Sequence, residues 1–289
     1  MTDRSCPLCS ENQANYIFTE RGHDLLQCQA CDLFFIHPYP EQTEVYETVS
    51  DYEYDDLEIL DSQRHYESSC ATHDILYPQL REEFVGAKNV LDVGCGTGRL
   101  LELLKEFDGL NRVGMELNRP RAAFAREKAE CTILEIPVQN HTPETPYDVI
   151  ALMNVLAHVP DCVGFLETIK KQLSPNGKAI IKVGEMESNV KKTAIFDWQI
   201  PDHLQLFGLR TIEYLVNKVG MKVVRHERTP LRDELFSKWR WMAPGRSSLR
   251  NFVKRMVART PMALPILRSI YGLRHGDSVY SSLIVITRQ

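Results

Sequence analysis

Four cysteines near the start of the chain are spaced as two pairs, each with two residues between its members. Cys6 and Cys9 form the first pair, Cys28 and Cys31 form the second, and 18 residues separate the pairs. Four thiolates with this spacing can complete the tetrahedral shell of one zinc ion. Because no ligand position is left for water, the predicted site is structural. Four free thiols are the alternative interpretation.

The segment between the two pairs predicts a small hairpin, with strands in residues 15–22 and 24–28. A module of this length cannot be stable through burial alone, so the metal would supply its folding energy. We therefore predict that residues 1–40 form a zinc ribbon.

A second stretch that could do chemistry is the glycine-rich sequence LDVGCGTGRLL at residues 91–101. Gly94, Gly96 and Gly98 permit a sharp turn from a strand into a helix, and they let a ligand approach the backbone without interference from Cβ atoms. Cys95 lies within the same turn and is likewise expected to contact the bound ligand. The third glycine follows the second by two residues, whereas a dinucleotide-binding loop has a spacing of three. The spacing therefore disfavours a nicotinamide dinucleotide.

Two acidic residues narrow the chemistry of the ligand. Asp92, at the end of the predicted strand, would repel a pyrophosphate but could receive an ammonium group. Glu116 lies 18 residues beyond Gly98, where a carboxylate can accept both hydroxyls of a ribose. A ligand that carries a carboxylate, an ammonium group and a ribose fits these residues better than a dinucleotide does. An ordinary surface acid is the alternative for Glu116.

The glycine turn belongs to a region in which short apolar strands alternate with helical stretches. This pattern predicts an α/β fold with a parallel sheet covered on both faces. The strands are expected at residues 89–93, 112–116, 130–136, 147–152 and 178–183, each followed by a helical stretch, with two more at 221–227 and 281–288. Helices are also expected near residues 63–77 and 209–220. We expect a helical linker or lid over 41–85 and a Rossmann-like domain over 86–289, with a helical insertion at about 230–278.

Four motifs in this region resemble those of class I S-adenosylmethionine-dependent methyltransferases. They are LDVGCGTG, GMELN, YDVIALMNVLAHVPD and LSPNGKAIIKV, and the resemblance covers roughly residues 86–229. It implies a seven-stranded, mostly parallel sheet whose last strand inserts antiparallel. It also implies that the three glycines lie against the methionine part of S-adenosylmethionine, with Asp92 near its amino group and Glu116 at the ribose. Glu135 is a candidate for the adenine contact.

Three further residues are expected at the reacting end. Asn154 and His158 follow the fourth strand, at the sheet edge where ligands of open α/β sheets bind. Asn154 is expected to line the cofactor, and His158 is either catalytic or a helix-start histidine bonded to a neighbouring carbonyl. His203 lies in a stretch similar to the DEH segment of sugar C-methyltransferases, which also begin with a zinc module. That resemblance makes His203 the candidate base, although Ile200 stands at that family's tyrosine position.

The sequence predicts transfer of a methyl group to oxygen or carbon of a small-molecule acceptor: a sugar, a lipid-linked compound or a natural product. An RNA methyltransferase and a non-catalytic S-adenosylmethionine-binding protein are the alternatives. The net charge of −5 and the absence of NPPY and Pro-Cys motifs make a nucleic-acid partner less expected. The basic stretch at 228–274 could contact a membrane surface. No apolar run approaches about 18 residues and no signal peptide is visible, so a cytoplasmic protein is expected.

Overall fold

The computed structural model describes residues 5–38, 62–186, 199–230 and 280–289, together with residues 256, 260 and 266. The first part of the predicted linker or lid, residues 41–61, lies outside these ranges. The predicted helical insertion at about 230–278 and the basic stretch at 228–274 lie almost entirely outside them. None of the helices within the described ranges is long and apolar enough to cross a membrane.

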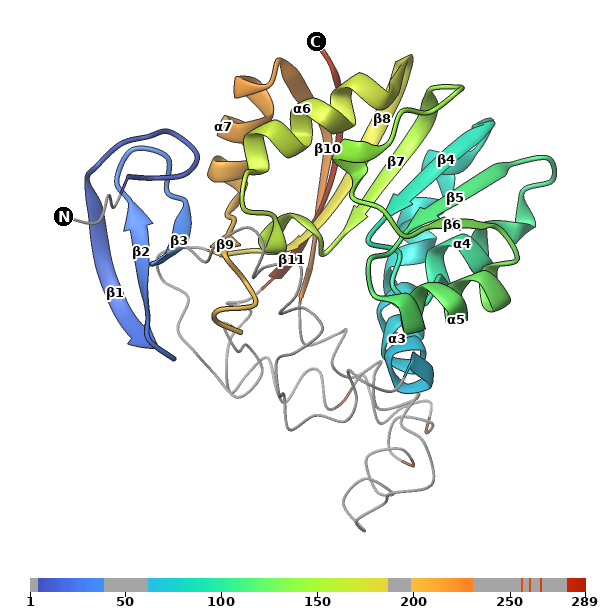
Figure 1. Ribbon diagram of the computed structural model, residues 1–289, viewed down its shortest axis with the longest axis horizontal. Coiled ribbons are helices and arrows are strands. Elements are labelled where there is room, and N and C mark those ends of the chain that lie inside the picture. Colours follow the sequence, from blue (N-terminus) through green and yellow to red (C-terminus); the bar gives the residue numbers. More distant parts are fainter. Residues whose placement is uncertain are drawn as a thin grey trace.

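The larger sheet runs through the centre of the molecule (Figure 1). Its described strands are β4 (Asn89–Val93), β5 (Asn111–Met115), β6 (Thr132–Leu134), β7 (Tyr147–Met153), β8 (Leu173–Gly184), β10 (Met221–Pro230) and β11 (Tyr280–Arg288). Their order across the sheet is β10-β11-β8-β7-β4-β5-β6. The pairs from β8 to β6 are parallel, and β11 lies antiparallel between β8 and β10. The predicted Rossmann-like sheet with an inserted antiparallel last strand is confirmed.

Helices cover both faces of this sheet (Figure 1). The described helices are α3 (Ser62–Leu80), α4 (Arg99–Leu103), α5 (Arg119–Ala129), α6 (Cys162–Gln172) and α7 (Leu209–Lys218), with 3₁₀ turns η1 (Arg81–Phe84), η2 (Leu104–Glu106), η3 (Val138–Asn140) and η4 (Leu156–His158). Leu166 of α6 and Ile212 of α7 pack in one core cluster, and Leu80 of α3 packs in another. Both faces of the sheet are therefore buried under helices, which explains the continuous apolar runs of the central strands.

Local sequence accounts for the helix boundaries and faces. Asn118 caps α5 by accepting a hydrogen bond from the Arg121 backbone N–H at 3.1 Å, and Asp161 caps α6 by accepting from the Gly164 N–H at 2.9 Å. In α7 the buried residues are two adjacent pairs that lie four positions apart, which places them on one face. These residues are Thr211, Ile212, Leu215 and Val216.

Helix α3 belongs to the core of the larger domain. Leu76 and Leu80 of α3, and Phe84 of η1, lie in the same buried cluster as Val90 of β4 and Ile180 of β8. The helical part of the predicted linker thus packs directly against the sheet.

The smaller sheet combines the N-terminal segment with a strand from the larger domain. It contains β1 (Ala14–Glu20), β2 (His23–Cys28), β3 (Phe34–His37) and β9 (Gln205–Leu206), in the order β1-β2-β3-β9. The hairpin of β1 and β2 agrees with the sequence expectation, whereas β3 and β9 were not expected. In Figure 1 the three N-terminal strands lie to one side, and β9 lies between them and the larger sheet.

Three local expectations were wrong. Strand β6 covers only Thr132–Leu134, and the chain after it forms the 3₁₀ turn η3 in place of the expected helical stretch. Glu116 does not end its strand, because β5 stops at Met115. Pro137 helps to explain why no helix forms between β6 and β7, since proline has no N–H to donate within a helix.

Candidate functional site

The glycine turn connects the end of β4 to the start of α4. Gly94, Gly96 and Gly98 all have positive φ angles, of 66°, 55° and 80°. The turn is closed by a hydrogen bond from the Gly98 N–H to the Cys95 carbonyl at 2.9 Å. The Cys95 N–H donates to the Met115 carbonyl at 2.9 Å, and its side chain is buried in the cluster formed by α4, α5 and β6. Cys95 therefore shapes the turn from within the protein.

Glu116 ties this turn to the beginning of α5. Its carboxylate accepts hydrogen bonds from the Gly96 N–H at 2.9 Å and from the Asn118 N–H at 2.8 Å. The acid is thus fixed at the carboxyl edge of the sheet, beside the glycine turn. This is the place at which an acidic residue binds ribose hydroxyls in Rossmann-type sites.

Asp92 lies beneath the turn and is 2% exposed. Burial, and secondly the negative charge of Glu116, raise its pKa from 3.8 to about 8. Its Oδ1 atom is buried without a hydrogen-bond partner in the part of the chain that the structure describes. An acceptor left in this way is costly, so the site favours a donor that reaches Asp92 or a proton carried by Asp92 itself.

Helix α3 contributes a residue to this site that sequence reasoning missed. A Cβ placed on Gly96 would lie 2.8 Å from Cε1 of His65. The His65 ring also contacts Thr97, with Nδ1 3.3 Å from the hydroxyl oxygen. Tyr66, the next residue, donates to Glu102 of α4 at 2.5 Å. Helix α3 therefore covers the glycine turn and is held there by α4.

Asn154 stands at the end of β7, in a left-handed conformation with φ of 62°. Its Oδ1 accepts a hydrogen bond from Lys182 Nζ at 3.0 Å, and Lys182 is only 3% exposed. Val155 packs against Gly94, because a Cβ on that glycine would lie 2.8 Å from Val155 Cγ2. The segment after β7 therefore borders the glycine turn directly.

His158 and His203 come together from segments that are 45 residues apart in the sequence. Their ring centroids are 4.8 Å apart, with the planes inclined by 50°. His158 Nδ1 lies 2.9 Å from the backbone carbonyl of Asp202 and 3.4 Å from its Oδ1 atom. His158 is thus bonded to a backbone carbonyl, as expected for a histidine without a catalytic role. The carbonyl, however, belongs to the residue that precedes His203.

Charge pairing sets the protonation of this group. Burial lowers the pKa of His158, but the hydrogen bond and the negative charge of Asp202 outweigh burial, so the pKa is raised overall. Burial alone would raise the pKa of Asp202. The hydrogen bond to His158 outweighs burial, so the pKa of Asp202 is lowered overall. An ionised Asp202 beside a protonated His158 is the arrangement that these opposing effects favour.

Arg121 connects the two halves of the site electrostatically. Burial lowers the pKa of its guanidinium, while the charges of Glu116 and Asp202 raise it. Arg121 therefore lies within range of the acid at the glycine turn and of the acid beside the histidines. No pattern in the sequence indicates this role, since Arg121 is one of several basic residues at the start of α5.

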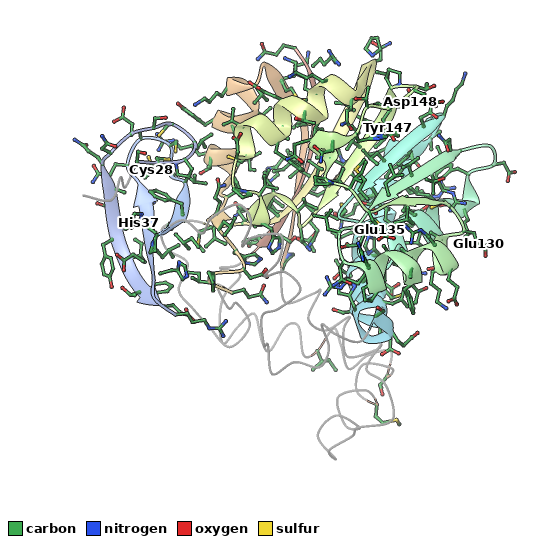
Figure 2. All side chains as sticks on the ribbon, in the orientation of Figure 1. Cys28, His37, Glu130, Glu135, Tyr147 and Asp148 are labelled. Carbon is green, nitrogen blue, oxygen red and sulfur yellow. The ribbon has the colours of Figure 1, made fainter. Side chains whose placement is uncertain are left out.

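The four N-terminal cysteines converge in the smaller sheet, where Cys28 is labelled in Figure 2. Their sulfur atoms all lie within 4.8 Å of one another, with Cys6 and Cys31 at 3.6 Å and Cys9 and Cys28 at 3.4 Å. Tetrahedral zinc with Zn–S bonds of about 2.3 Å requires sulfur separations of roughly 3.8 Å. The donor set therefore fits a structural zinc ion.

Glu135, the candidate for the adenine contact, directly follows β6. Its carboxylate forms an ion pair with Arg126 of α5 at 2.6 Å. Figure 2 shows Glu135 beside α5 at the side of the larger sheet away from the N-terminal module. The adenine contact stays unassigned.

Comparison with known proteins identifies the family of this domain. Residues 61–226, more than half of the chain, match a family model described as a methyltransferase domain. The chain belongs to this methyltransferase family.

Individual relatives agree with the family assignment. A ubiquinone biosynthesis O-methyltransferase of Proteus mirabilis is 33% identical over 108 residues, which are 35% of this chain and 44% of that protein. The chain thus spans less than half the length of this curated relative.

Solved structures share the fold of the methyltransferase domain. A S-adenosylmethionine-dependent methyltransferase from Geobacter sulfurreducens, solved with S-adenosyl-L-homocysteine, aligns with a TM-score of 0.52 and 14% identity over 77% of this chain and 98% of that one. The [4+2]-cyclase SpnF aligns with a TM-score of 0.54 and 16% identity over 74% of this chain and 81% of that one. At these identities the similarity establishes the fold alone.

Proposed function

We propose that the protein transfers a methyl group from S-adenosylmethionine to an oxygen or carbon atom of a small-molecule acceptor. The observation that carries this proposal is the glycine turn with its two acids. Gly94, Gly96 and Gly98 form a tight turn with no room for a Cβ, Glu116 is fixed beside it, and Asp92 has a buried oxygen without a partner among the described residues. The family match supports the same activity.

The residues of the turn fit the parts of S-adenosylmethionine. Backbone of the three glycines would lie along the methionine portion, the amino group would approach Asp92, and Glu116 would accept hydrogen bonds from the ribose. Asn154 would border the cofactor at the end of β7. When bound, S-adenosylmethionine supplies an electrophilic methyl group on a positively charged sulfur. The chain itself has to align an acceptor with that methyl group, and such alignment can contribute several kcal/mol.

We assign proton removal to His203. The imidazole accepts the proton of an acceptor hydroxyl or acidic C–H group. The electron pair left on oxygen or carbon forms the bond to the methyl carbon, and the pair of the broken S–C bond stays on sulfur. General-base assistance of this kind adds about 10²–10⁴-fold to a rate. The His203 ring lies beside that of His158, with ring centroids 4.8 Å apart, and His158 is itself held by Asp202.

The ligand atoms of His158, Asp202 and His203 lie within 4.8 Å of one another, which is close enough for a metal ion. We favour proton transfer over metal binding for two reasons. His158 Nδ1 is already engaged by Asp202. In addition, the nearby guanidinium of Arg121 opposes a further cation.

The proposal is tested by incubation of the protein with methyl-labelled S-adenosylmethionine and fractionated cell extract. Label in a small-molecule fraction is the expected result, and label in RNA would favour an RNA methyltransferase. Once the acceptor is known, His203→Ala should lower kcat by about 10²-fold or more without changing the Kd for S-adenosylmethionine. His141→Ala is the control, because His141 is bonded to Tyr147 at the opposite end of β7. Unchanged turnover in His203→Ala would remove the histidine from the mechanism.

A further inference from the structure

The segment that carries Asp202 and His203 continues directly into the smaller sheet. Strand β9 pairs antiparallel with β3, with Phe34 opposite Leu206 and Phe35 opposite Gln205. The Ile36 N–H also donates to the Leu204 carbonyl at 3.1 Å. Strand β3, which follows Cys31 in the chain, is thus hydrogen-bonded to the segment up to Leu204, the residue next to His203.

The opposite side of the same segment is bound to the methyltransferase site. The Leu204 N–H donates to the Ala157 carbonyl at 2.9 Å, next to His158. Gln205 is fully buried, and its Nε2 donates to the carbonyls of Val159 at 2.7 Å and Pro160 at 3.0 Å. The segment is therefore held between β3 on one side and the turn after β7 on the other.

Further contacts fix the N-terminal module on α7. Thr211 Oγ1 donates to the Cys31 carbonyl at 3.1 Å, and Lys218 Nζ donates to the Leu8 carbonyl at 2.6 Å. Both acceptors belong to the cysteine pairs or lie between their members. Leu8 also shares a buried cluster with Phe207, which follows β9. The cysteine end of the module is thus anchored on α7, which begins three residues after β9.

We propose that the N-terminal cysteine module is a positioning element for the acceptor side of the site, and that it holds Asp202 and His203 in place through the pairing of β3 with β9. This inference rests on the proposed function. The module contributes no group to the reacting atoms. A zinc ion held by the four cysteines would keep β2 and β3 folded. Strand β3 aligns β9, and β9 fixes the residues immediately before it. Since displacement of a catalytic group by about 1 Å can cost 10²-fold in rate, such support is consequential.

The coupling is tested with two variants of the full-length protein. Cys28→Ser/Cys31→Ser removes two of the zinc ligands. Thr211→Val/Lys218→Met removes the anchoring hydrogen bonds but leaves all four cysteines, so native mass spectrometry should still show one zinc ion per chain. Lys170→Met is the matched control, because Lys170 Nζ donates to the carbonyls of Val219 and Gly220 in place of a carbonyl of the module.

Hydrogen–deuterium exchange gives a readout that needs no acceptor. Both double variants, Cys28→Ser/Cys31→Ser and Thr211→Val/Lys218→Met, should speed amide exchange in residues 203–207 by about tenfold or more. Exchange in residues 91–96 around the glycine turn should change little. Titration with S-adenosylmethionine should give an unchanged Kd. With a known acceptor, kcat should fall by about tenfold or more, whereas the control keeps wild-type values in all three measurements.

Two outcomes would overturn the inference. Unchanged amide exchange at residues 203–207 in both double variants would show that the N-terminal module does not hold these residues in place. Equal acceleration at residues 91–96 would show a general loss of stability in place of positioning. A wild-type protein that methylates no acceptor would instead refute the proposed function, and the exchange data would still decide whether the module and the segment are coupled.

Discussion

Replacement of Gly98 by alanine tests how closely the glycine turn is packed against α5. Gly98 has a φ angle of 80°, and a Cβ at this position would lie 3.0 Å from the Cβ and 3.1 Å from the Cα of Ala125. Two costs therefore combine in Gly98→Ala. The left-handed conformation costs an L-residue about 1–2 kcal/mol, and an extra methyl in a packed core costs about 1–3 kcal/mol. We expect the free energy of unfolding to fall by about 2–5 kcal/mol.

Gly109 provides a matched control for the conformational cost. Its φ angle is 74°, close to that of Gly98, but a Cβ there would have no atom within 4 Å. Gly109→Ala should therefore lose only about 1–2 kcal/mol. The difference between the two variants isolates the packing conflict with Ala125.

Urea unfolding followed by circular dichroism measures both variants. The slopes should match that of the wild type, so that differences in midpoint report stability. Equal losses in Gly98→Ala and Gly109→Ala would refute the reasoning, since the backbone of α5 would then not lie against the turn. The expected larger loss in Gly98→Ala would show that the third glycine is required by packing as well as by conformation.

Three further predictions concern charge and metal. Asp202→Asn should lower the pKa of His158 to below its ordinary value, because burial then acts without the opposing acid; an NMR titration in which this pKa stays raised would contradict the pairing. Asp92 has its pKa raised from 3.8 to about 8, so the ligand-free protein should lose stability as pH rises between these values and no further above 8. This loss, at most about 1.4 kcal/mol per pH unit, should be absent in Asp92→Asn, and identical pH profiles of the two proteins would argue against a buried acid. Native mass spectrometry of the intact protein should show one zinc ion that is lost in Cys28→Ser/Cys31→Ser, and an intact protein without metal would remove the zinc assignment.

Local patterns in the sequence were sufficient to predict the main sheet. Strand–helix alternation and the LDVGCGTG turn fix a Rossmann-like domain because buried parallel strands require continuous apolar runs, and a turn with positive φ angles requires glycine. The cysteine spacing predicted the convergence of four sulfur atoms for a similar reason, since each pair is local. The prediction of a helical stretch after β6 was wrong, because a short apolar run does not reveal whether a helix or a 3₁₀ turn follows it.

The sequence by itself therefore determined the local motifs: the glycine turn, the acid beyond the second strand, and the two cysteine pairs. Only the tertiary structure decided how they meet. It placed His65 over Gly96, Asp202 against His158, and β9 beside β3. These contacts join residues far apart in the chain, and their partners are chosen by the packing of whole elements, which leaves no periodic or spacing signal in any one segment.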